Sequence, residues 1–125
     1  MGKVTGLGGI FYKAADPAKT AAWYKEMLGL GGEWGIMFPW KADPGAAEAF
    51  SLLSAFKADT EYFAPSAAGF MVNLRVDDRD AMVAELRAKG VEILGTQDED
   101  YGLFAWILDP DGIKIELWQQ IGGAP

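Results

Sequence analysis

The sequence predicts one α+β domain built from two βαβββ modules that follow each other along the chain. The length of 125 residues fits a single domain. An alternating apolar segment followed by a capped helix occurs twice, and strand-like segments come after each helix. We therefore expect a single domain over residues 1–125, with modules at about 1–63 and 69–121 and a linker at 64–69.

The first module opens with a loosely alternating segment from Leu7 to Ala15, which predicts a strand. Asp16 and Pro17 follow as an N-cap and a proline at the first helical position, so a helix is expected over 18–28. Gly29 ends that helix. The strand candidates after it are 33–38 and 49–56, and a looser segment over 39–48 separates them.

The second module repeats this order. Val72, Leu74 and Val76 alternate as in a strand, Asp77-Asp78 caps a helix, and Gly90 ends it. Residues 77 and 90 each lie 61 positions after their counterparts 16 and 29, which indicates an internal repeat. Further strands are predicted over 91–95, 101–108 and 113–119, and the turn sequence Asp109-Pro110-Asp111-Gly112 joins the last two.

Alternation along the strands also predicts which side chains share a face of the sheet. One face is apolar and must cover the helices, for example with Ile115 and Leu117. The opposite face mixes aromatic, amide and charged side chains, which is typical of a cleft wall: Gly9, Phe11, Lys13, Met71, Asn73, Arg75, Lys114, Glu116 and Trp118.

Composition narrows the class of protein. The chain has neither cysteine nor histidine, which excludes disulfides, Cys-ligated metals and most Ser-His or Cys-His mechanisms. A net charge of −7 argues against a nucleic-acid partner. No apolar run is long enough for a membrane helix, and residues 1–6 lack the apolar core of a signal peptide, so we expect a cytoplasmic protein without a membrane partner.

Three segments resemble the vicinal oxygen chelate superfamily, which contains glyoxalases, extradiol dioxygenases and bleomycin-resistance proteins. Residues 109–118, DPDGIKIELW, are similar to the closing hairpin DPxGxxIELW of that family. Residues 23–30 resemble its first helix, usually FYxxxLG, and residues 76–78 resemble the start of its second helix. The resemblance covers nearly the whole chain in order.

The resemblance implies a curved mixed sheet that forms a cup, with the helices on the outer face and a second subunit in a homodimer. In metal-dependent members each module gives two metal ligands, and here those positions are Gly9, Met71, the segment 51–54 and Glu116. Only Glu116 has a suitable side chain, whereas a catalytic metal normally has about three protein ligands. We therefore expect no metal and no cofactor.

Glu116 and Tyr101 are the candidate catalytic residues. Glu116 is either a solvated or arginine-paired carboxylate, or it has a functional role as a buried acid or base or as an anchor for a cationic ligand. Arg75 either clamps a substrate carboxylate or pairs with Glu116 or Asp77. The candidate ligand-binding residues are Phe11, Met71, Asn73, Arg75, Trp106, Glu116 and Trp118, although the aromatic ones could equally be ordinary core.

Three functions follow as hypotheses. The first is a metal-free small-molecule-binding protein, similar to the bleomycin-resistance branch, that captures an aromatic or cationic ligand. The second is a glyoxalase- or dioxygenase-like enzyme, a lyase or an oxidoreductase that acts on a small oxygenated substrate. The third is a regulatory or scaffold dimer with an empty cup. The acidic residues 98–100 are expected to form a solvated loop.

Overall fold

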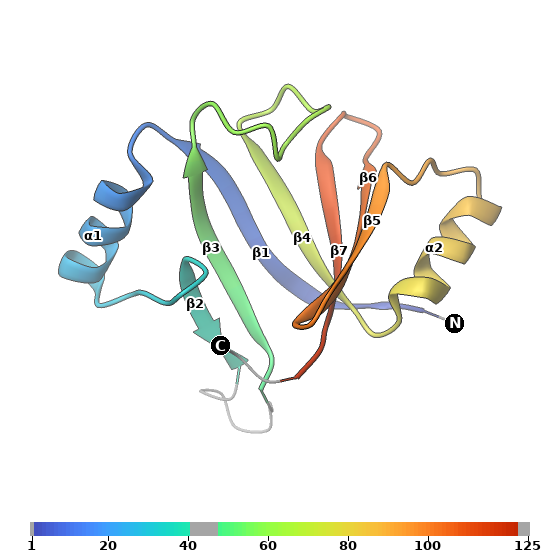
Figure 1. The fold of residues 1–125 in the computed structure, drawn as a ribbon, viewed down its shortest axis with the longest axis horizontal. Coiled ribbons are helices and arrows are strands. Elements are labelled where there is room, and N and C mark those ends of the chain that lie inside the picture. Colours follow the sequence, from blue (N-terminus) through green and yellow to red (C-terminus); the bar gives the residue numbers. More distant parts are fainter. Residues whose placement is uncertain (1, 41–47, 123–125) are drawn as a thin grey trace.

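A computed structural model describes residues 2–40 and 48–122. They form two helices and seven strands (Figure 1), and residues 41–47 of the predicted loose segment lie outside the described part. In chain order the elements are β1 (Val4–Ala14), α1 (Pro17–Leu28), β2 (Ile36–Pro39), β3 (Phe50–Lys57), β4 (Phe70–Val76), α2 (Arg79–Ala88), β5 (Gly95–Glu99), β6 (Gly102–Leu108) and β7 (Lys114–Gln120).

The seven strands form one mixed sheet in the order β2-β3-β1-β4-β7-β6-β5. The central pair β1 and β4 is antiparallel, whereas β1 runs parallel to β3 and β4 runs parallel to β7. The sheet curves, and the helices lie outside it, α1 beyond the end with β2 and β3 and α2 beyond the end with β5 and β6 (Figure 1). The predicted α+β class is confirmed, with three strands from the first half of the described chain and four from the second.

The helix starts follow from the capping residues. The carboxylate of Asp16 accepts a hydrogen bond from the Lys19 backbone N–H over 3.1 Å. In α2 the cap is Asp78, which accepts from the Ala81 N–H over 3.0 Å, whereas Asp77 accepts from the Lys3 N–H. The cap of α2 therefore lies 62 positions after that of α1, one more than the repeat read from Asp77.

Two clusters of buried side chains lie on the two faces of the sheet, as alternation predicted. Leu117 packs with the residues under α2, and its neighbour Trp118 packs on the other face, which we call the cup. The α2 cluster contains Val76, Val83, Ala105 and Leu117, and the cup cluster contains Phe11, Phe50, Leu52, Phe63, Met71 and Trp118. The sequence therefore assigned the faces of β1, β4 and β7 correctly.

The strand predicted over 91–95 is wrong. Asp98 and Asp100 are exposed to solvent as predicted, but Asp98 and Glu99 belong to a strand and not to a loop. The fifth strand runs instead from Gly95 to Glu99 at the edge of the sheet. The apolar residue Ile93 packs against the α2 cluster before the strand begins, which explains the misleading pattern. Asp98 lies inside β5 and forms a 2.7 Å ion pair with the buried guanidinium of Arg79.

In the described residues, no helix combines the length and the apolar character that a membrane crossing requires.

Candidate ligand-binding site

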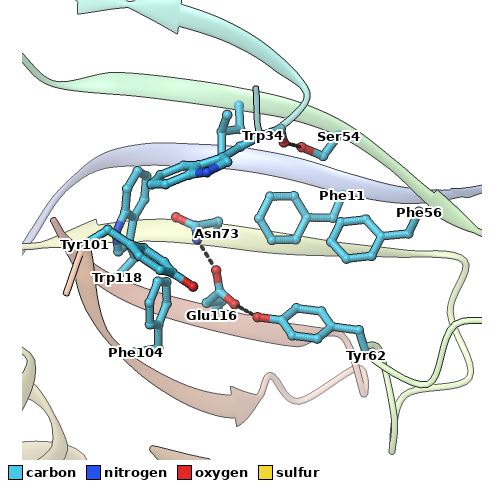
Figure 2. Close-up of a pocket in the computed structure, with 11 residues that line it drawn as sticks. Phe11, Trp34, Ser54, Phe56, Tyr62, Asn73, Tyr101, Phe104, Glu116 and Trp118 are labelled. Carbon is cyan, nitrogen blue, oxygen red and sulfur yellow. Dashed lines mark hydrogen bonds between the residues drawn. The ribbon is translucent and has the colours of Figure 1, made fainter. Parts of the chain in front are cut away.

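The cup contains a pocket of about 330 Å³. Seven of its eleven described lining residues are aromatic, and Glu116 is the one charged residue among the eleven. Figure 2 shows Trp34 and Trp118 on one side of the pocket, Phe11 and Phe56 on another, and Tyr62 pointing across to Glu116. The lining residues are Phe11, Trp34, Leu52, Ser54, Phe56, Tyr62, Asn73, Tyr101, Phe104, Glu116 and Trp118.

The floor of the pocket comes from two related pairs of strands. Phe11 of β1 is in register with Ser54 of β3, and Asn73 of β4 is in register with Glu116 of β7. Each residue of the second pair lies 62 positions after its counterpart, the same spacing as between the helix caps. The backbone is therefore nearly twofold symmetric here, while the side chains are not.

Glu116 is buried, with 3% of its surface exposed, and three side chains donate hydrogen bonds to it. Asn73 Nδ2 donates to Oε1 over 2.6 Å. Trp106 Nε1 donates to Oε2 over 2.9 Å, and the Tyr62 hydroxyl donates to the same oxygen (Figure 2). Such a set of donors suits an ionised carboxylate, because a carboxylate accepts and does not donate.

Burial raises the pKa of Glu116 above its ordinary value, since the charged form is poorly solvated. The three donors and the nearby ammonium of Lys114 act in the opposite direction and lower that pKa in part. The pKa of Tyr62 is raised as well, by burial first and then by the charge of Glu116. Tyr62 is therefore a neutral hydrogen-bond donor beside an acid that can gain or lose its proton.

Gly8 of β1 makes room for the Asn73 side chain. A Cβ atom at residue 8 would lie 1.7 Å from Asn73 Oδ1. Any side chain at residue 8 would therefore occupy the space that the Asn73 amide fills. Oδ1 is buried and has no hydrogen-bond partner in the described residues. The amide is therefore held by its bond to Glu116 and by packing over Gly8.

Lys114 lies two residues before Glu116 on β7 and faces the same side of the sheet, but it does not line the pocket. Its Nζ donates to the backbone carbonyl of Tyr62. The ammonium lies 5.0 Å from the centre of the Tyr62 ring and 5.6 Å from that of Trp106. Burial lowers the pKa of Lys114, and the charge of Glu116 opposes this change.

The chain that forms this cup matches a known protein family. Residues 6–117 match the Glyoxalase/Bleomycin resistance protein/Dioxygenase superfamily. The chain belongs to this superfamily. The resemblance inferred from the hairpin and helix motifs is confirmed.

Solved structures of superfamily members share the fold. A Streptomyces coelicolor methylmalonyl-CoA epimerase is 18% identical, with 96% of this chain and 100% of that chain covered and a TM-score of 0.70. A Mycobacterium tuberculosis methylmalonyl-CoA epimerase is 24% identical, with 95% and 90% covered and a TM-score of 0.63. The Mn(II)-bound glyoxalase from Novosphingobium aromaticivorans is 19% identical, with 99% and 42% covered and a TM-score of 0.61.

Among curated proteins, no sequence matches this chain. Because the sequence identities to these solved structures are 24% or lower, the similarity shows a shared fold and no shared activity.

The side chains of the cup do not fit the metal site found in some superfamily members. The described residues contain no group of three or more His, Cys, Asp or Glu side chains that could hold a metal ion. At the positions expected for ligands, Gly9 packs against the Leu52 carbonyl and Met71 is fully buried in the cup cluster. The Ser54 hydroxyl donates to the Trp34 carbonyl over 2.7 Å.

Most of the predicted site residues come together in the superfamily cup. Phe11, Asn73, Tyr101, Glu116 and Trp118 line the pocket. Trp106 contributes its indole N–H to Glu116 without lining the pocket, and Met71 packs in the cup cluster. Whether these residues bind a ligand or act in catalysis stays a prediction.

The predicted ion pair between Arg75 and Glu116 or Asp77 is not formed in the described residues. The Arg75 guanidinium donates instead to the Phe50 carbonyl and to Gln120 Oε1, over 3.2 and 2.7 Å. It lies 4.8 Å from the centre of the Trp118 ring, outside the pocket lining. Burial disfavours its charged form and lowers its pKa. Glu116 is therefore the buried acid of the two alternatives, without an arginine partner.

Six lining residues were not predicted. Leu52, Ser54 and Phe56 alternate along β3, so the rule applied to the other strands could have found them. Phe104 alternates with Trp106 on β6 in the same way. Trp34 lies within the strand predicted over 33–38, but β2 begins only at Ile36, so Trp34 belongs to the turn before it. Tyr62 comes from the connection between β3 and β4, where no periodic signal exists.

Proposed function

We propose that this protein binds a small, flat organic molecule that carries a positive charge. The single observation behind this proposal is that one buried carboxylate, Glu116, lies on the floor of a pocket lined mainly by aromatic rings. Aromatic faces attract cations, by about 2 kcal/mol or more where water is excluded. A carboxylate at the same place adds a charged hydrogen-bond acceptor.

The size of the pocket supports a small ligand. Its volume of about 330 Å³ lies near the lower end of the range typical of ligand sites. Rings on several sides favour a planar molecule, which can stack on one and meet others edge-on. Oε1 of Glu116 receives one donor and Oε2 receives two, so Oε1 is the oxygen with room for a ligand N–H.

The test compares two probes of nearly the same shape, 2-naphthamidine, which is a cation, and 2-naphthamide, which is neutral. Calorimetry at pH 8 should show tighter binding of the cation to the unaltered protein. Glu116→Gln should weaken binding of the cation by about 10- to 100-fold, because a hydrogen bond to a charged group contributes about 1.5–3 kcal/mol. Equal binding of the cation by both proteins would refute the proposal.

An enzyme is the second candidate, and the raised pKa of Glu116 favours it. A buried carboxylate with a raised pKa is a stronger base than an exposed one, which suits a general base. Glu116 could take a proton from a substrate carbon next to a carbonyl group and return it. The Tyr62 hydroxyl donates a hydrogen bond to Glu116 and would hold the carboxylate in place. Incubation with methylmalonyl-CoA in D₂O, followed by NMR, tests this candidate. Absence of exchange at that carbon, or equal exchange with Glu116→Gln, would count against it.

We also propose that the protein is a cytoplasmic homodimer. Support for a dimer comes from β2 and β5, which are the edge strands of the sheet in the described residues, because exposed edges tend to be paired or covered. Two apolar side chains of α1 are also exposed, Trp23 by 51% and Met27 by 61%.

A further inference from the structure

We propose that Lys114, a residue outside the pocket lining, is a positioning residue that holds Tyr62 against Glu116 and supplies the counter-charge that limits how strongly the pocket prefers cations. This inference rests on the proposed function for its ligand, but its effect on Glu116 can be measured without one.

The first step is the way in which Tyr62 is held. Tyr62 belongs to the connection between β3 and β4, and both of its polar ends reach β7. Its carbonyl accepts from Lys114 Nζ and its hydroxyl donates to Glu116, two residues further along the same strand. One tyrosine is therefore fixed at two points, and removal of Lys114 would free one of them.

The second step is electrostatic. The rings of Tyr62 and Trp106 are perpendicular, with their centres 6.1 Å apart, and the Lys114 ammonium lies near both. The polar hydrogens of the same two side chains point at Glu116 Oε2. Lys114 and Glu116 are thus a buried cation and a buried anion that contact the same two partly buried aromatic side chains.

The third step is that Lys114 has few other partners. Its side chain is buried, and the residue is 8% exposed. Across residues 2–40 and 48–122, no carboxylate lies within ion-pair distance of its Nζ. A buried ammonium without a contacting anion is costly, so the negative charge of Glu116 behind the rings is its main compensation. For Glu116 the hydrogen bonds from Tyr62, Trp106 and Asn73 offset burial first, and the charge of Lys114 adds to them.

The titratable or charged groups that face Glu116 come from three places. They are Tyr62 from the β3–β4 connection, Tyr101 from the turn between β5 and β6, and Lys114 from β7 itself. The neighbouring strands β4 and β6 contribute the neutral donors Asn73 and Trp106. Lys114 is therefore the one cation in this set of described residues. A cationic ligand would bring a second positive charge near Glu116, and Lys114 would repel it.

The test uses the Trp106 indole N–H as a reporter, because it donates directly to Glu116. Its ¹H–¹⁵N resonance, assigned with Trp106→Phe, is followed from pH 4 to pH 9 without ligand. Lys114→Gln removes the charge and keeps a donor for the Tyr62 carbonyl, Lys114→Met removes both, and Lys114→Arg keeps the charge. Lys13→Met is the control, since Lys13 lies near Phe63 on the other half of the sheet.

Both neutral variants should move the midpoint of the titration upward by about one pH unit, at the low end of the effect of a nearby opposite charge. Lys114→Arg and Lys13→Met should leave it in place. In the neutral variants the ratio of Kd values for 2-naphthamide and 2-naphthamidine at pH 8 should rise about tenfold over the unaltered protein.

An unchanged midpoint in folded Lys114→Gln would overturn the inference. If Lys114→Met fails to fold, Lys114→Gln still decides, because it keeps a side-chain N–H that can donate to the Tyr62 carbonyl. A shifted midpoint with binding of neither probe would refute the proposed ligand and leave the role of Lys114 intact. A purely structural role would lower stability in the neutral variants without moving the midpoint, and that result would also overturn the inference.

Discussion

Asn73 and Glu116 lie opposite each other on the parallel strands β4 and β7, and the amide Nδ2 donates to Oε1 over 2.6 Å. This pair joins two of the three polar side chains of the pocket floor across adjacent strands, the third being Ser54. Both side chains are almost fully buried, with 1% of Asn73 and 3% of Glu116 exposed. The bond therefore fixes the direction in which the carboxylate faces, and the energetics of the pocket depend on whether that carboxylate is charged.

The stability of the protein should depend on pH through Glu116. Its pKa is raised by folding, so the native state binds more protons than the unfolded state above about pH 4.3, the ordinary value for glutamate. The contribution of Glu116 to stability is full below that pH and is lost as pH rises through the folded-state pKa.

Glu116→Gln removes this titration. We expect the difference in unfolding free energy between the unaltered protein and the variant to decline with rising pH, by about 1.4 kcal/mol for each pH unit by which folding displaces the pKa. Urea denaturation at pH 4.5, 6 and 8 measures it. A difference that is constant across the three pH values would contradict the prediction.

The two tryptophans of the pocket should respond differently to truncation. Trp118 is 2% exposed and packs on Phe50, with ring centres 5.1 Å apart, so Trp118→Ala should lower the unfolding free energy by about 3–5 kcal/mol. Trp34 is only partly buried and comes from a loop.

Trp34→Ala should therefore weaken binding of 2-naphthamidine with a smaller loss of stability. Thermal unfolding and calorimetry of both variants give the comparison. The assignment of Trp34 to the ligand wall would be wrong if Trp34→Ala bound the probe as tightly as the unaltered protein.

Arg79 should be important for the stability of the second half of the sheet. Its guanidinium donates to the Phe104 carbonyl over 2.8 Å and to Asp98 over 2.7 Å, joining the start of α2 to β5 and β6. Arg79→Met leaves these acceptors without their donor, and we expect a loss of about 2–3 kcal/mol in urea denaturation. Arg87→Met, on the exposed side of the same helix, is the control and should change stability by less than about 0.5 kcal/mol.

Light scattering tests the proposed homodimer. We expect a mass of twice 13.5 kDa at micromolar concentration. Trp23→Glu and Met27→Glu, which place charges on the exposed face of α1, distinguish this surface from the sheet edges. Dissociation by these substitutions assigns the interface to α1, persistence of the dimer assigns it elsewhere, and a monomer of the unaltered protein refutes the proposal.

Prediction from the sequence succeeded where side chains alternate between two different environments. Phe11, Asn73, Glu116 and Trp118 were placed on the cup face because their neighbours along the strands are apolar and pack toward the helices. It failed at the edge strand β5, where polar residues are paired through the backbone and the apolar pattern before them belongs to packing under α2. Tyr62 could not be found, because its position depends on where an irregular segment crosses the cup.

The near-symmetry of the pocket floor has a consequence for the orientation in which a ligand binds. Residues 11 and 73 occupy equivalent places, as do 54 and 116, yet an anion occurs at one of these four places alone. A binding site with twofold side chains would accept a molecule in either of two opposite poses. If the proposed ligand binds, we expect its positively charged end at Glu116 and its other end toward Phe11 and Ser54. We therefore expect the pocket to select a ligand by the position of its charge as well as by its shape. The backbone of the pocket floor is nearly twofold symmetric, so this selectivity comes from the four side chains alone.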